Sequence, residues 1–222
     1  MEENSVNTRV YSKTFLWMFL GLLATGVISV FTYSTDILFN IVSSGAWPVI
    51  LIVELVVVIL FSFLYKKLPA IVVSILYFVY AVINGFSMAT IFYVFELKSI
   101  IYIFFAAAAI FGLTAFYGYI TKKDLSKIGT ILIITLIVCV VISLINLFIG
   151  ASYLDMIIDW IVLLAFFGIT AWDMQKVKLV ASNANGMSVE DENKLAINCA
   201  MELYLDFINI FIRLLNFFGK RK

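Results

Sequence analysis

The chain has 222 residues, of which 64% are hydrophobic and 13% are charged, and its mean hydropathy is +1.11. A soluble domain is about half apolar and a quarter charged, so a soluble fold of this size would leave too much apolar surface in water. The net charge of +1 offers no basic excess for nucleic-acid binding, and the absence of histidine excludes Ser-His catalysis, His-metal centres and haem with a His ligand. We therefore expect a protein of the lipid bilayer, with no tightly bound cofactor and no nucleic-acid partner.

Charged residues divide the chain into apolar segments of the length that a membrane helix needs, about 20 residues. We predict seven transmembrane helices, at about residues 15–34, 47–65, 70–94, 99–121, 128–149, 156–178 and 195–218. The segments do not alternate as the strands of a membrane barrel must, so the prediction is an all-α protein in which residues 1–222 form one polytopic membrane domain. Ser188 and Asp191 have the spacing of a capping box, which would start the last helix near Val189; a solvated loop is the alternative.

Lys and Arg in the short loops predict the orientation of the helices, because cytoplasmic loops carry an excess of them. One side of the membrane collects ten of these residues: Arg9, Lys13, Lys66, Lys67, Lys122, Lys123, Lys127, Lys176, Lys178 and Lys194. The other side has only Lys98 before the C-terminus, so we expect a cytoplasmic N-terminus. Seven crossings then place the basic tail, residues 220–222, outside, against the charge rule. A last segment that re-enters the membrane without crossing it is the alternative, and we favour the crossing.

The strongly polar side chains of the last helix fall within one arc of about 80° when successive residues are placed 100° apart. They are Asn198, Glu202, Asp206, Asn209, Arg213 and Asn216. A charge at the bilayer centre costs about 2.5–3.5 kcal/mol, so this polar stripe must face protein or water. We interpret it as part of an ion path. The alternative is a structural stripe, in which Glu202 or Asp206 pairs with Arg213 and the amides join neighbouring helices.

Other predicted helices also contain acidic residues and glycines whose roles can be predicted from their positions. Asp173 lies in the C-terminal half of the sixth helix, where the helix dipole disfavours an anion, so it needs a proton, a cation or a base. Asp159, near the start of that helix, is interpreted as an interfacial residue, and Glu54 in the second helix is either part of the ion path or satisfied locally. Gly112 and Gly118 in the fourth helix are predicted to be positions of close packing.

Three sequence blocks occur in a distinctive order and spacing. They are AAAAIFGLTAFYGYITKKDLSKIG from Ala106 to Gly129, AWDMQKVK from Ala171 to Lys178, and LYLDFIN from Leu203 to Asn209. These blocks resemble the Bax-inhibitor family of membrane proteins, in its bacterial calcium-leak type, and the likeness covers about residues 50–219.

This resemblance implies a bundle of six helices around a central C-terminal helix, and a pH-sensitive calcium leak. It implies that Asp173 and Asp206 share a proton near the cytoplasmic mouth, act as sensor and gate, and bind calcium transiently. Two departures accompany it. The basic residue that latches onto the aspartate pair in calcium-leak members corresponds to Tyr65 here, and Glu202 adds an acid at a position that is usually uncharged.

We therefore expect a pH-sensitive calcium leak channel in the bacterial plasma membrane, with calcium ions and protons as its partners, rather than an enzyme. Its pore or ion path would include Glu54, Glu202, Asn209 and Arg213, because conduction needs several weak sites. A calcium/proton exchanger would use the same residues, although no inverted repeat is visible. A non-conducting regulatory protein that binds membrane proteases or other channels is the second class. An intramembrane aspartyl protease is disfavoured, because neither aspartate has a glycine-rich setting.

Cysteine labelling tests the predicted orientation. Ser188→Cys and Lys222→Cys are made separately after Cys139 and Cys199 are replaced by alanine. A membrane-impermeant maleimide should label the first variant only from the cytoplasmic side and the second only from the outside. Labelling of both positions from the cytoplasm would contradict a crossing by the last helix.

Overall fold

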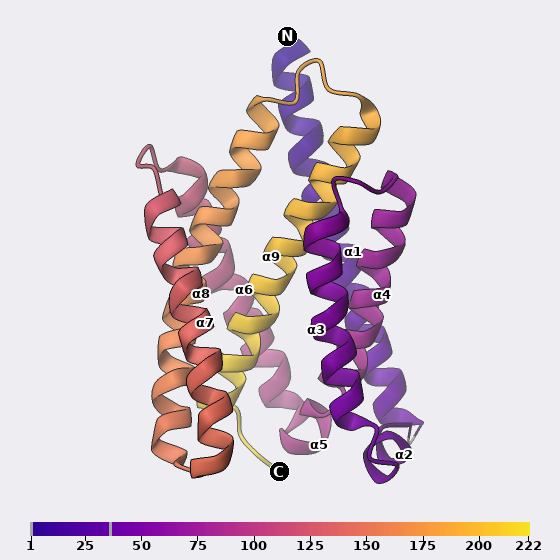
Figure 1. Cartoon of the computed structure of the whole chain (residues 1–222), viewed down its shortest axis with the longest axis vertical. Helices are drawn as coiled ribbons and strands as arrows, with labels where there is room; N and C mark the ends of the chain where they lie inside the picture. The colour runs from indigo at the N-terminus through magenta and orange to yellow at the C-terminus, as the bar shows by residue number, and fades with distance from the viewer. Residues whose placement is uncertain (1, 36) are drawn as a thin grey trace. The chain divides into compact units, whose positions relative to one another are not determined.

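The computed structural model describes residues 2–35 and 37–222, and helices make up 86% of the chain, with no strand in the described part (Figure 1). The helices are α1 (Glu2–Ser34), α2 (Ile37–Ser43), α3 (Trp47–Leu64), α4 (Ala70–Met88), α5 (Ile91–Val94), α6 (Leu97–Ile120), α7 (Ser126–Ile149), α8 (Ser152–Ser182) and α9 (Val189–Phe218). Within the described residues, seven helical spans are long and apolar enough to cross a membrane. The predicted all-α membrane fold is confirmed.

The helix ends differ from the predictions where polar residues continue a helix beyond the apolar segment. α1 begins at Glu2 rather than near residue 15, and α8 continues to Ser182. α9 begins at Val189, and the Ser188 hydroxyl accepts a hydrogen bond from the Asp191 N–H at 3.1 Å, so the capping box is confirmed. The third predicted helix is divided by a turn into α4 and α5, and the short α2 has no counterpart among the predicted helices.

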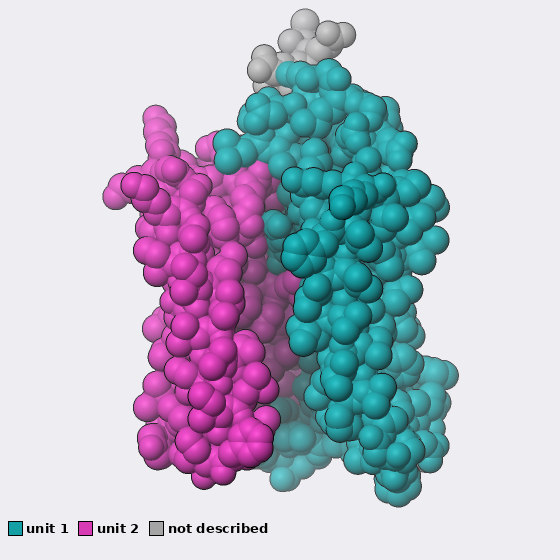
Figure 2. Space-filling view, viewed as in Figure 1, with its two compact units in different colours: residues 1–97, 179–204, 220–222 teal, residues 98–178, 205–219 magenta. Residues whose placement is uncertain are grey.

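The chain divides into two compact units, which Figure 2 draws in different colours. Unit 1 comprises residues 1–97, 179–204 and 220–222, and so contains α1–α5 and the first half of α9. Unit 2 comprises residues 98–178 and 205–219, and so contains α6, α7, most of α8 and the second half of α9. Each unit has its own set of interhelical contacts.

In unit 1, α1 and α4 pack through a glycine and through hydroxyl groups. A Cβ added at Gly85 would lie 2.7 Å from Cβ of Ile28, which shows how closely the two helices approach. The Ser29 hydroxyl donates to the Gly85 carbonyl at 2.9 Å, and the Thr25 hydroxyl donates to the Ala81 carbonyl at 3.0 Å. Small residues and interhelical hydrogen bonds hold membrane helices together, because lipid supplies no hydrophobic driving force between them.

In unit 2, α8 packs against α6 and α7 through further glycines. A Cβ added at Gly118 on α6 would lie 2.0 Å from the Ala171 carbonyl oxygen, and one added at Gly129 on α7 would lie 2.1 Å from the Trp172 ring. The predicted close packing at Gly118 is therefore confirmed. The same prediction for Gly112 is wrong, because no described atom lies within 4 Å of an added Cβ there. Gly112 and Gly118 look alike in the sequence but face different surroundings.

The two ends of α9 contact opposite ends of α1 within unit 1. Near the start of α9, the Glu192 carboxylate forms an ion pair with the Lys13 ammonium at 2.8 Å. After the end of α9, Lys222 reaches the Tyr33 hydroxyl at 3.4 Å. Lys13 and Tyr33 are separated by about 30 Å along a helix, which equals the thickness of the hydrocarbon core. A re-entrant last segment would bring both contacts to the same end of α1, so this geometry favours a crossing.

α9 is the most buried of the seven spans. Of its most apolar stretch 67% is buried, against 6–39% in the other spans. This burial accords with a helix that carries charges it must keep away from lipid. The expected arrangement of six helices around α9 stays a prediction.

A bulky side chain at Gly118 tests the close packing of α6 on α8. Gly118→Val should lower the free energy of unfolding by about 1–3 kcal/mol, because the added atoms meet backbone that cannot move aside cheaply. Thermal unfolding in detergent micelles measures the change. Gly112→Val on the same helix is the matched control and should change stability far less. Equal losses for the two variants would contradict the packing described here.

Candidate functional site

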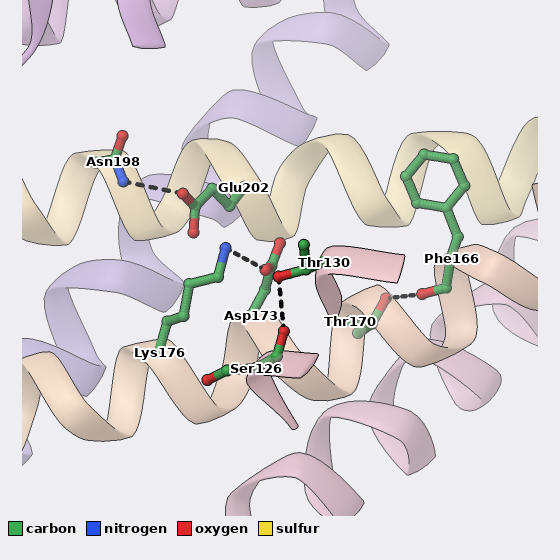
Figure 3. A network of polar contacts seen from close by, with 8 residues as sticks. All are labelled: Ser126, Thr130, Phe166, Thr170, Asp173, Lys176, Asn198 and Glu202. Atoms are coloured by element: carbon green, nitrogen blue, oxygen red, sulfur yellow. Dashed lines mark hydrogen bonds and ion pairs between the residues drawn. The ribbon is translucent and has the colours of Figure 1, made fainter. Parts of the chain in front are cut away.

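Asp173 is a buried carboxylate on α8 that has a base one helical turn away. Asp173 is 4% exposed, and its Oδ1 lies 2.6 Å from the Lys176 ammonium (Figure 3). The same ammonium lies 3.9 Å from the centre of the Trp172 ring, an arrangement that favours a cation over an aromatic face. The sequence requires a proton, a cation or a base for Asp173, and Lys176 is that base. The sequence analysis missed it, although the i,i+3 spacing is visible in the sequence.

Asp206 is a second buried carboxylate of unit 2 and lies on α9. It is 2% exposed. The next residue, Phe207, packs edge-on against Phe104 and Phe111 of α6, with ring centres 5.3 and 5.8 Å apart. This turn of α9 is therefore packed against aromatic side chains of α6. The direct contact of Asp206 with Asp173 stays a prediction.

Glu54 on α3 accepts hydrogen bonds from three side chains of α4. The Ser87 hydroxyl donates at 2.7 Å, the Tyr80 hydroxyl donates at 3.3 Å, and the Asn84 amide donates as well. Asn84 in turn accepts a hydrogen bond from the Tyr204 hydroxyl of α9 at 2.9 Å. Glu54 is thus part of a polar network inside unit 1, which favours the local interpretation of this residue over a place in the ion path.

Three further residues of the α9 stripe, Asn198, Glu202 and Asn209, have partners on α9 itself. The Asn198 amide donates to Glu202 at 3.2 Å in unit 1, as Figure 3 shows. The Asn209 amide donates to the Leu205 carbonyl at 2.8 Å in unit 2. Both bonds connect residues four apart, which lie on one face of a helix.

Arg213 forms an ion pair with Asp159 of α8, within unit 2. This contact corrects the interpretation of Asp159 as merely interfacial. It also differs from the structural alternative in which Glu202 or Asp206 would neutralise Arg213. Sequence reasoning could not find the pair, because it depends on which faces of α8 and α9 meet.

Two of the three sequence blocks contact each other at the loop between α6 and α7. The Gln175 side chain of α8 accepts a hydrogen bond from the Leu125 N–H at 2.9 Å and donates to the Lys123 carbonyl at 2.8 Å. Within the loop, hydrogen bonds from the Ser126 hydroxyl and N–H lower the pKa of Asp124. Since the folded pKa lies below the unfolded value, Asp124 stabilises the loop above the unfolded pKa, and this contribution is lost as pH falls through the folded pKa.

The described residues contain no group of three Asp, Glu or Cys side chains that could hold a metal ion. The fold and the buried charges together define a polytopic helical membrane protein with ionisable groups inside its helical units, the kind of group that marks ion and proton paths in membranes.

The comparison with known proteins identifies the family. A family model described as "Inhibitor of apoptosis-promoting Bax1" matches residues 7–222, so the chain belongs to this Bax-inhibitor family. The inner membrane protein YbhL of Escherichia coli is 33% identical over 213 residues, which cover 95% of this chain and 91% of that protein. A Deinococcus radiodurans protein is 34% identical over 210 residues, which cover 95% of this chain and 90% of that protein. A membrane protein of Streptococcus pyogenes is 37% identical over 145 residues, which cover 65% of this chain and 62% of that protein.

These findings agree with the predicted location. The name of the Escherichia coli relative and the seven apolar spans of this chain are both consistent with a multi-pass protein of the bacterial plasma membrane. The resemblance drawn from the three sequence blocks is thus confirmed at the level of the family.

Substitution of Gln175 tests the contact between the two blocks. Gln175→Met should lower the free energy of unfolding by about 1–3 kcal/mol, because the N–H of buried Leu125 loses its acceptor. Chemical unfolding in detergent, with limited proteolysis of residues 121–126, measures the loss. Lys178→Met removes an exposed bond to the Tyr119 carbonyl, which water can replace, and serves as the control. An unchanged stability in Gln175→Met would show that the loop is held by other contacts.

Proposed function

We propose that this chain is a pH-sensitive calcium leak channel whose gate is the aspartate pair Asp173 and Asp206. The observation that carries the proposal is the burial of both carboxylates in unit 2, on the two helices that contain the family's motifs. A buried carboxylate is costly unless a proton, a cation or a base compensates it. Two such groups in one membrane unit are more typical of a proton-operated site than of a packed helix interface.

In this proposal Lys176 replaces the basic latch residue that binds the aspartate pair in calcium-leak members, because Tyr65 at the corresponding position carries no positive charge. In the closed state, Asp173 is ionised and is held by the Lys176 ammonium, which lies 2.6 Å away. Protonation of Asp173 removes the charge that Lys176 binds, so this contact weakens and the site rearranges. An ion pair within one helix does not join two helices. We therefore expect a leakier closed state than in relatives whose latch lies on the second helix.

Calcium would bind the aspartates only transiently. Carboxylate oxygens are the ligands that Ca²⁺ prefers, and conduction requires binding that is weak and repeated along the path. Glu202 and Asn209 continue the series of polar side chains along α9. Glu54 and Arg213 have structural partners instead. Glu54 accepts three hydrogen bonds, and Arg213 pairs with Asp159.

Calcium flux into proteoliposomes, measured across a range of pH, tests the proposal. Flux through the wild-type protein should rise as pH falls, by no more than about tenfold per pH unit for one titrating proton. Asp206→Asn mimics the protonated form and should give high flux that no longer depends on pH; Asp173→Asn should do likewise. Lys176→Gln should raise the flux at high pH, because Asp173 loses its base. Glu96→Gln, which removes an exposed surface pair with Lys220, is the control.

The other outcomes each point to a different function. Wild-type flux with an unchanged pH profile in Asp206→Asn would make the aspartate pair structural. Strict stoichiometric coupling of calcium and proton movement would identify an exchanger. A folded protein without flux at any pH would favour a non-conducting regulatory protein.

A further inference from the structure

Unit 2 contains a pocket of about 370 Å³ between α7, α8 and α9. Its volume is at the lower end of the range for small-molecule sites, about 300–1,000 Å³. Most of the lining is aliphatic or aromatic, and includes α7 side chains from Leu136 to Leu147. The polar groups are few: Ser143, Asn209 and Arg213, with the thiol of Cys139. An apolar pocket of this kind is not filled by water, which needs two to four polar partners for each molecule.

The pocket has the length and direction of one lipid chain within one leaflet. Leu147 lies two residues before the end of α7 at Ile149, whereas Leu136 lies near the middle of that helix. Their separation of eleven positions corresponds to about 16 Å along the helix axis. Half of the hydrocarbon core is about 15 Å thick. The α7 wall of the pocket therefore has the length of half the hydrocarbon core, and one end of it lies near the end of α7.

The α7 wall of the pocket is open to the outside of the helix. Val140, Leu144 and Leu147 line the pocket, and yet 58%, 56% and 79% of their surfaces are exposed. Because these side chains both line the pocket and are exposed, an acyl chain of a surrounding lipid can enter the pocket directly from the bilayer. A closed core cavity would have no such rim.

The polar end of the pocket presents a hydrogen-bond donor that lacks an acceptor. Asp159 accepts from Nη1 of Arg213, but Nε of the same guanidinium is buried and has no hydrogen-bond partner among the described residues. Arg213 lies five residues before the end of α9 at Phe218, about 8 Å along the helix, and so near the boundary of the hydrocarbon core. The ester carbonyls of phospholipids lie at that boundary. Because Asp159 already neutralises the guanidinium, a neutral carbonyl oxygen suffices as the acceptor.

We propose that this pocket binds one acyl chain of a membrane phospholipid, with the ester carbonyl accepting a hydrogen bond from Arg213 Nε. The apolar length of the pocket matches the chain, the exposed rim admits it, and the buried donor recognises the ester. The site is separate from the aspartate pair, and the proposal does not depend on calcium flux.

Photo-crosslinking in proteoliposomes tests this site on the unaltered protein. The probe is a diacyl phosphatidylethanolamine with a diazirine in one acyl chain, and its partner is the dialkyl ether analogue, which lacks the carbonyl. The ester probe should label peptides around Cys139 more than the lipid-facing surface of α1, and Cys199, which is buried in unit 1, should not be labelled. The ether probe should label the Cys139 peptides at least about tenfold less, the effect of losing one hydrogen bond to a charged group.

Arg213→Lys is the matched variant, because lysine keeps a positive charge for Asp159 but has no Nε donor. Ester and ether probes should then label the Cys139 peptides equally. Equal labelling by both probes in the wild-type protein would overturn the carbonyl contact. Labelling around Cys139 that is no stronger than on α1 would overturn the site itself and would indicate ordinary lipid contact only.

Discussion

The structure depends on one constraint: an ionisable group between membrane helices must find its partner inside the protein. Where lipid surrounds a helix, an uncompensated charge costs several kcal/mol, and three ionisable groups here have close polar neighbours that compensate them. Asp173 has Lys176, Glu54 has three donors on α4, and Arg213 has Asp159. These partners differ in kind. The first is a base on the same helix, the second a ring of neutral donors, and the third a charge from another helix.

Close packing by glycine connects the loop between α6 and α7 with Asp173. Gly129 allows the Trp172 ring to approach α7, and the face of that ring carries the Lys176 ammonium that binds Asp173. Gln175, in the same turn of α8, holds the loop backbone. A change at the loop surface therefore has a continuous route of contacts to the buried carboxylate, and the two sequence blocks form one structural element.

Sequence reasoning found the helices and most polar residues but not how they pair. The seven spans were predictable because charged residues interrupt the apolar segments at the thickness of a bilayer. Asp173 was predictable as a residue that needs a partner, since the helix dipole disfavours it there. The pairing of Arg213 with Asp159 was not, because it depends on which helix faces meet. For the same reason Gly112 and Gly118 could not be told apart.

The polar stripe of α9 has a consequence for how the protein is made. α9 is the least apolar of the seven spans and carries Glu202, Asp206 and Arg213 within its length. A charge at the bilayer centre costs about 2.5–3.5 kcal/mol on insertion, and less near the interface, so a helix with three charges partitions poorly into lipid on its own. α9 is also the last span to be synthesised, when Lys13, Tyr33 and Asp159 are already in the membrane to receive its ends and its arginine. The charges of α9 therefore favour its insertion against the earlier helices over insertion into lipid alone.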